Sequence, residues 1–328
     1  MGTPTPKGSP AWTARLLRST LQDAVDMLAD ASEVAVQQPS VAHRASIHAY
    51  ITQSPHRELL AGVYDFNKEV VERLLRASFD MTKAIIGILE SDDPAPVSAL
   101  ILDRALGEVI LRVCFIYDAA VPPARTLVRM ALYQLESLEG NLRTAEAFGE
   151  EGADEAARAR ETIAEMHAML TAGGFEIGPG RRPSLSAWLR LDGETESASF
   201  NATDAYKRYV KVGSWQWAIG SGATHSLGWL LPNVVGTVDE PPMSTPSETL
   251  LTVFLSIIEV ADALAQAVHG YTGADIEWFL KKIHQRRLGA SAAQGDPMSH
   301  AVDHREYGSK LRQPSFPTAS GGASFRTI

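Results

Sequence analysis

One stretch of the sequence, residues 97–117, restricts the possible folds more than any other because it is strongly apolar and still carries four charged side chains. Fifteen of its 21 residues are apolar. On a helix, which advances about 100° per residue, Arg104, Glu108 and Arg112 fall on one stripe, with apolar residues in and beside it. We therefore expect a central helix that is buried on most sides, with its ions paired or hydrogen-bonded.

The order Arg, Glu, Arg at four-residue spacing indicates a ladder of mutually neutralising side chains with one positive charge left over. Three acidic residues elsewhere are available to balance that charge, namely Asp118, Glu136 and Glu259. Two interpretations stay open. Either the ladder only fixes the register of the helix, or Arg104 and Arg112 line an anion or nucleotide pocket. In this second interpretation Arg125 and Arg129 lie near the same pocket and belong to the candidate site.

The two most apolar stretches, 97–117 and 249–269, approach the length of a membrane-spanning helix. Each charge in the first would cost roughly 2.5 to 3.5 kcal/mol at a bilayer centre, so a spanning helix is not expected there. The N-terminus, MGTPTPKGSPAW, lacks the apolar run of a secretory signal. Cys114 is the only cysteine, which excludes an internal disulfide framework. We expect a soluble, cytoplasmic protein that does not contact a membrane.

Composition limits the partners of this chain. It is 45% hydrophobic and 21% charged, enough apolar material for a sizeable core. Its net charge is −9 and its pI is about 5.5, so the body as a whole does not attract phosphate backbones. DNA binding is therefore not expected, and any RNA contact has to be local.

The rest of the sequence predicts an all-α fold, an irregular bundle of six to eight helices around the buried central one. Long segments without proline carry Leu, Val, Ile, Ala and Met at helical spacing, and Thr245-Pro246-Ser247-Glu248 has the order of a capping box. The expected helices are 10–36, 54–90, 97–117, 123–149, 153–171, 203–231, 245–270 and 272–287, with a short segment at 40–52. We expect one helical domain over 1–288, with a possible subdivision into 1–90 and 91–288.

Two regions depart from the helical pattern. Residues 173–202 are the main irregular connection and contain either a short helix or a hairpin at Asp192-Gly193. Residues 289–328 contain five Gly, six Ser and three Pro, with few large apolar side chains to offset the entropy of ordering. This composition predicts a disordered C-terminal tail.

His225 is a second candidate for a ligand-binding or catalytic residue. It stands in GSGATHS, where small residues allow a ligand or another backbone to approach closely, and tryptophans at 215, 217 and 229 surround it in the sequence. A packed, hydrogen-bonded histidine at a helix contact is the alternative. The weaker candidates are Tyr209, Ser221 and the loop arginines Arg181 and Arg182, for which a solvated loop is the competing explanation.

The segment KKIHQRR at 281–287 is the main basic cluster. It has two explanations. Its side chains complement the carbonyl end of a helix dipole, or they contact nucleic acid together with the tail behind them.

Several chemistries lack their motifs. The sequence has no HExxH for zinc, no Glu-x-x-His for a di-iron bundle and no GxSxG nucleophile elbow. His43, His48 and His56 are unevenly spaced, and Cys114 lies in an apolar helix that favours an inert thiol. We expect no metal site and no cofactor.

Four pieces of the sequence occur in a recognisable order: RALGEVILRVCFIYD at 104–118, the arginines at 125 and 129, PSLSAWLR, and DAYKRYV leading into GSGATHS. In this order they resemble helical proteins of the HEPN-like kind that are common in actinobacteria, a family of unassigned function. There an Arg-x-x-x-Glu-x-x-x-Arg helix is followed much later by Tyr-Arg and a small-residue segment ending in His. The resemblance covers roughly residues 97–231 and implies a helical scaffold.

Catalytic HEPN ribonucleases carry Arg-x4-His, with a general acid or base acting on the RNA 2′-hydroxyl. No arginine here has a histidine five positions on, so that mechanism is not supported. Three hypotheses follow. The first is a non-catalytic helical module that binds a second copy of itself as a homodimer, another protein or RNA. The second is an enzyme or small-anion receptor that uses the Arg104 stripe with His225. The third, which depends on the resemblance alone, is an atypical RNA-targeting toxin or defence component.

Overall fold

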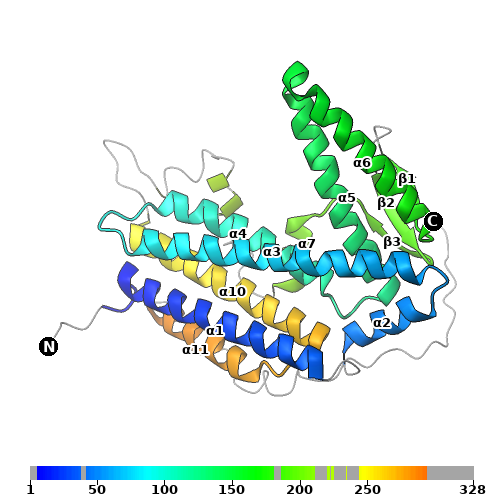
Figure 1. The fold of residues 1–328 in the computed structure, drawn as a ribbon. Coiled ribbons are helices and arrows are strands. Elements are labelled where there is room, and N and C mark those ends of the chain that lie inside the picture. Colours follow the sequence, from blue (N-terminus) through cyan, green and yellow to red (C-terminus); the bar gives the residue numbers. More distant parts are fainter. Residues whose placement is uncertain are drawn as a thin grey trace, which may run out of the picture.

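The computed structural model describes residues 6–37, 42–180, 186–210, 220–221, 223–224, 234 and 244–293. Across these ranges the chain forms nine α-helices, one short 3-10 helix and a small three-stranded sheet (Figure 1). The helices are α1 (Pro10–Gln37), α2 (His43–Gln53), α3 (Arg57–Leu89), α4 (Pro96–Ile116), α5 (Pro123–Ala147), α6 (Ala153–Ala172), α7 (Ala202–Tyr209), α10 (Pro246–Thr272) and α11 (Glu277–Ala293). The 3-10 helix is η1 (Gly149–Gly152), and the strands are β1 (Glu176–Pro179), β2 (Ser186–Leu191) and β3 (Glu194–Ser197).

The predicted all-α class is confirmed, and the sheet is a small addition to it. The short segment expected at 40–52 is a regular helix, α2, which brings the number in the described ranges to nine. The capping box is also present. Thr245 accepts a hydrogen bond from the backbone N–H of Glu248 (3.2 Å), and the Glu248 carboxylate accepts one from the backbone N–H of Thr245 (2.7 Å).

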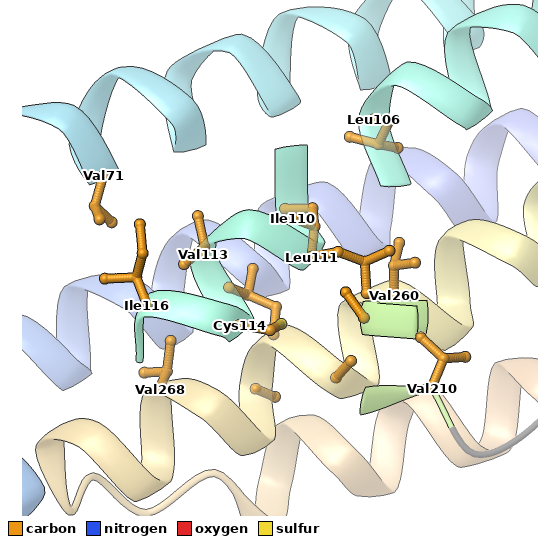
Figure 2. Close-up of a cluster of buried hydrophobic side chains, with 14 of the residues drawn as sticks. Val71, Leu106, Ile110, Leu111, Val113, Cys114, Ile116, Val210, Val260 and Val268 are labelled. Atoms are coloured by element: carbon orange, nitrogen blue, oxygen red, sulfur yellow. The ribbon is translucent and has the colours of Figure 1, made fainter. Parts of the chain in front are cut away.

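The hydrophobic core lies where α4 packs along α10, with α1, α3 and α11 around them (Figure 1). Figure 2 shows part of this core, including Ile110 and Cys114 from α4 and Val260 from α10. The cluster of buried apolar side chains is continuous from Ala14 to Ala290. The same core therefore contains side chains from residues 1–90 and from residues 91–288, the two parts of the possible subdivision.

The helix that is enclosed on all sides is α10 rather than α4. Residues 249–260 of α10 are buried without interruption, whereas in α4 Ile101 is 41% exposed. The reason is the position of charge. No charged residue lies between Glu248 and Glu259, so apolar neighbours surround that stretch without a desolvation cost. In α4 the charged stripe keeps one side near the surface.

By length and composition α10 could also cross a membrane, and it is the one helix in the described ranges that passes this test. In this fold 78% of its most apolar window is buried inside the chain. Its apolar surface is thus already covered by protein, as in the central helix of a globular core.

Residues 176–179, 186–191 and 194–197 form an antiparallel sheet in the order β1-β2-β3, where the sequence suggested an irregular connection. The alternative of a hairpin at Asp192-Gly193 is correct, because these two residues join β2 to β3. Both have positive φ, 48° and 82°, as a type I′ turn requires, and Asp-Gly is a preferred pair for that turn. The buried side chains of Leu189 and Leu191 anchor β2 in the core, and the strand packs against α5.

Helices α5 and α6 pack against each other as a hairpin that projects from the body (Figure 1). A separate small core holds them together, consisting of Leu142, Ala145, Ala156, Ala159 and Ile163. The connection between α5 and α6 requires glycine at position 152, since a Cβ there would lie 2.0 Å from the carbonyl oxygen of Ala145. The projection is therefore a packed element with its own apolar contacts.

The end of α10 differs from the prediction. The helix continues past Gly270 to Thr272, and Gly273 terminates it in the left-handed conformation with φ of 76°. Gly270 has a packing role instead, because a Cβ at this position would lie 2.9 Å from Cβ of Ala119. Both glycines are needed, one for close approach and one for chain reversal.

The helix expected over 203–231 begins as α7 but ends at Tyr209, where the backbone of Val210 is extended. Its first turn is capped by Asn201, whose side-chain oxygen accepts hydrogen bonds from two backbone N–H groups. Helical backbone is present again at Gly220 and Ser221. The prediction of one continuous helix is therefore wrong at this break.

Several predictions fall outside the described residues. They concern His225, Arg181, Arg182 and the tail from residue 294 onward. The first five residues of the predicted tail, 289–293, are the last turn of α11.

Candidate functional site

The charged stripe of α4 forms two separate ion pairs. Arg104 contacts Glu108 at 2.7 Å, with side-chain exposures of 11% and 44%. Arg112 turns away from Glu108 and donates two hydrogen bonds, of 2.5 and 3.1 Å, to Glu136 of α5. Glu136 is one of the three acidic residues expected to balance the ladder. The stripe is thus neutralised by paired charges at the edge of the core.

Arg112 also lies between aromatic rings. Its guanidinium is 4.6 Å from the ring centre of Phe200 and 5.5 Å from that of Tyr133, distances at which a cation is attracted to a ring face. Burial alone would lower the pKa of Arg112, but the hydrogen bonds and charge of Glu136 raise it above its usual value.

Arg129 is 1% exposed and is the largest fully buried side chain among the described residues. Its Nε donates to Glu196 at 2.7 Å, and its Nη1 donates to the carbonyl of Phe115 at 2.8 Å and to Asp118 at 3.2 Å. The guanidinium also lies 3.9 Å from the ring centre of Phe115. A buried arginine needs such compensation, because an unpaired charge in the interior costs several kcal/mol.

Asp118 follows α4 and has three partners besides Arg129. Tyr209 donates its hydroxyl at 2.9 Å and Ala120 its backbone N–H at 3.0 Å, while Arg208 forms an ion pair with the carboxylate at 2.5 Å. Burial would raise the pKa of this carboxyl, but these donors and the nearby charge of Arg129 hold it below its usual range. Asp118 therefore stays ionised and joins the end of α4 to α7.

Glu196 of β3 accepts hydrogen bonds from two arginines, because Arg125 and Arg129 each donate to its carboxylate at 2.7 Å. Burial would raise the pKa of Glu196, but the two guanidinium groups lower it. We use the name Arg129 cluster for Arg125, Arg129, Arg208, Asp118, Glu196 and Tyr209. The cluster joins α4, α5, β3 and α7 through ionic hydrogen bonds.

The structure thus brings three candidates, Arg125, Arg129 and Tyr209, into one cluster. Arg112 lies beside it, across a cavity of about 20 Å³ that both Arg112 and Arg129 line. Sequence reasoning missed Arg208, Phe200 and Glu196. Arg208 and Glu196 carried charges as a signal, but nothing in the local pattern placed them near residues about 70 to 90 positions earlier.

Arg104 lies apart from this cluster, where the small-residue segment packs on α4. A Cβ at Gly220 would be 3.3 Å from Cβ of Arg104, so the start of GSGATHS lies against the first half of α4. Ser221 is the next residue along that segment. His225 is four residues further along the sequence and lies outside the described residues.

A pocket of about 180 Å³ lies on the outer side of the Arg129 cluster. Its walls include the rings of Phe115, Phe200 and Tyr209, and its polar lining includes Asp204 and Arg208. Phe115, Ser197 and Phe200 line both this pocket and the smaller cavity.

The basic segment 281–287 belongs to a second cluster. Lys282 (2.6 Å) and Arg286 both contact Asp23 of α1, and Arg287 contacts Glu259 at 2.6 Å and Asp262 at 2.9 Å on α10. Since α11 continues to Ala293, these residues lie in mid-helix, so complementing the helix dipole does not explain them. These ion pairs join α11 to α1 and to α10.

A serine and a histidine approach each other next to the sheet. Ser186 Oγ is 3.1 Å from His167 Nε2, and the backbone N–H of Ser186 donates to the carboxylate of Glu139 at 2.8 Å. A catalytic triad requires the carboxylate on the imidazole, to orient it and stabilise its charge. Here the carboxylate holds the backbone of Ser186, so the arrangement fastens β2 between α5 and α6.

Asp103 is a buried carboxyl of a different kind. It is 4% exposed and lies on the α10 side of α4 near Ser256. Burial raises its pKa to about 8, more than the Ser256 hydrogen bond and the charge of Arg104 lower it. At neutral pH this group is therefore a neutral acid inside the core.

Comparison with protein-family models, with curated proteins and with solved structures finds no match. The HEPN-like resemblance therefore stays a prediction. Within the described ranges no three His, Cys, Asp or Glu side chains gather as metal ligands would.

Proposed function

We propose that this chain is a non-catalytic protein-binding module that docks through the tip of its α5–α6 hairpin. The observation that carries the proposal is Phe148 at the tip, whose exposed fraction of 64% is the highest among the large apolar residues of the described ranges. A phenylalanine held in water at the end of a packed projection favours association, because burying such a side chain stabilises by about 1.5 to 3 kcal/mol.

The candidate-site arginines support a structural rather than a catalytic role for that region. Arg112, Arg125 and Arg129 each have a carboxylate partner inside the fold. An anionic ligand would have to displace those carboxylates and leave them unpaired, at a cost that a weak metabolite does not offset. The hypothesis of an anion receptor is therefore the less favoured one.

Charge at the tip indicates what the partner surface is like. Glu150, Glu151 and Asp154 surround the corner and form no ion pair within the described part of the chain. A partner that receives Phe148 in an apolar pocket with a rim of Lys or Arg would be complementary. Pairing of two hairpin tips would bring like charges together, so we expect a different protein as the partner.

Photo-crosslinking tests the proposal. The photoreactive amino acid p-benzoylphenylalanine is placed at position 148 in the full chain, and at position 66 as a control. Phe66 is also an exposed phenylalanine (46%) but lies on α3. We expect one dominant adduct from position 148 that is absent from position 66. Mass spectrometry identifies the partner.

Binding of the purified partner then gives the quantitative check. Phe148→Ala is expected to weaken binding by at least about 10-fold, a change of about 1.4 kcal/mol, and Phe66→Ala to leave it unchanged. Equal binding by both variants, or an adduct with RNA instead of protein, would contradict the proposal. Light scattering on the free chain separates a homodimer from a heterologous complex.

A further inference from the structure

Two opposite charges line the pocket beside the Arg129 cluster without pairing with each other. Asp204 and Arg208 are four residues apart on α7, a spacing at which a carboxylate and a guanidinium often form an ion pair. Arg208 instead contacts Asp118 at 2.5 Å. Asp204 forms no ion pair within the described residues, and both side chains line the pocket of about 180 Å³.

The other walls of the pocket are aromatic rings, small polar groups and the carboxylate of Glu196, whose charge Arg125 and Arg129 already neutralise. The rings of Phe115, Phe200 and Tyr209 form one part, and the hydroxyl-bearing side chains of Ser197 and Ser199 form another. Phe200 packs edge to face against Phe115, with 5.6 Å between ring centres. Such walls accept a hydrocarbon or aromatic side chain of a small ligand.

These charges restrict the ligand. An anion would face Asp204, a cation would face Arg208, and a neutral apolar compound would remove both charges from water without replacing their hydration. A zwitterion with its opposite charges a few ångströms apart complements both. A free α-amino acid has this arrangement, and its side chain would lie against the aromatic walls.

We propose that this pocket binds a free α-amino acid, with the ligand carboxylate on Arg208 and the ligand ammonium on Asp204. Asp118 already orients this arginine and is itself held by Tyr209 and the backbone N–H of Ala120. Because 46% of the Arg208 side chain is exposed, its other N–H groups can bind the ligand carboxylate while the ion pair with Asp118 stays in place. An oriented side chain loses less entropy on binding. This site is separate from the hairpin tip and does not depend on the protein-binding proposal.

Calorimetry on the full chain tests the proposal. The 20 free L-amino acids are titrated one by one, together with two derivatives of each amino acid that binds. The N-acetyl derivative lacks the ammonium charge and the amide derivative lacks the carboxylate. We expect one or a few free amino acids with apolar or aromatic side chains to bind, and each derivative to bind at least about 10-fold more weakly.

Matched variants separate this site from general charge effects. Asp204→Asn and Arg208→Gln are compared with Asp154→Asn and Arg158→Gln. The control residues are also four apart, in the first turns of α6, and are exposed. We expect the first pair to weaken amino-acid binding by at least about 10-fold and the controls to leave it unchanged. Asp204 is outside the Arg129 cluster, so its variant is expected to keep the wild-type melting temperature.

Three results would overturn the proposal. The first is no heat of binding from any free amino acid at 10 mM, a concentration of about ten times a weak dissociation constant of 1 mM. The second is equal binding of the free amino acid and its N-acetyl derivative. The third is unchanged affinity in a folded Asp204→Asn variant.

Discussion

Two aspartates, Asp103 within α4 and Asp118 just after it, are both buried, but the surrounding fold shifts their pKa values in opposite directions. Asp118 is 8% exposed and its pKa is lowered, whereas Asp103 is 4% exposed and its pKa is raised to about 8. Asp118 accepts hydrogen bonds from Tyr209 and Arg129 and forms an ion pair with Arg208. Asp103 has one hydrogen bond, to Ser256, and its Oδ1 has no partner among the described residues.

Burial alone therefore does not decide whether a carboxyl is charged. The number and charge of its donors decide it, because they replace the lost hydration of the ionised form. The signs of the two pH effects are therefore opposite. Asp118 contributes stability above its unfolded pKa that is lost as the pH falls through its lowered folded pKa. Asp103 contributes stability below its unfolded pKa that is lost as the pH rises toward about 8.

The largest effect is expected from Arg129→Met, which removes the cation between Asp118 and Glu196. Two buried carboxylates would each lose a partner, and breaking such a pair costs about 3 to 5 kcal/mol. Urea unfolding followed by circular dichroism measures the change. Arg76→Met is the control, because Arg76 is 77% exposed in its ion pair with Glu72, and we expect it to cost less than about 1 kcal/mol. A loss that small for Arg129→Met would mean that Asp118 and Glu196 do not depend on Arg129 for their compensation.

The next effect is expected from Asp103→Asn. Between pH 4 and 8 the unfolded wild type ionises Asp103 while the folded protein keeps it protonated, so wild-type stability falls with rising pH. The amide does not titrate, so the variant should be more stable at pH 7.5 by on the order of 2 to 4 kcal/mol. Melting temperatures from pH 5 to 9 measure this. A variant whose pH profile has the wild-type slope would show that Asp103 is ionised in the folded protein.

The smallest effect is expected from Tyr209→Phe, which removes one donor from Asp118 and leaves the arginines in place. Hydrogen bonds to a charged acceptor contribute about 1.5 to 3 kcal/mol, and the remaining donors reduce the loss. We expect a destabilisation of about 1 kcal/mol at pH 7 and a shift of the acid unfolding midpoint to higher pH. A midpoint that does not move would mean that Tyr209 has no part in holding Asp118 ionised.

Much of the fold was predictable because its signals are local. The capping box at Thr245 and Glu248, the Asp192-Gly193 turn and the α5–α6 hairpin are each specified by a few neighbouring residues. The site was predictable only in part. Arg104 and Glu108 pair as their spacing suggests, and Glu136 was among the expected partners of the stripe. Nothing local indicated that Arg129 would contact Glu196, 67 residues away.

Most of the helices, the capping box at Thr245 and the need to compensate the charges on α4 follow from the sequence alone. Periodicity, capping and turn preferences act over distances of one to four residues, so they can be followed along the chain. The pairing of each carboxylate with an arginine, and the charge of each of the two buried aspartates, depend on the tertiary fold. The free energy of a buried charge depends on groups that the fold brings within a few ångströms from distant segments.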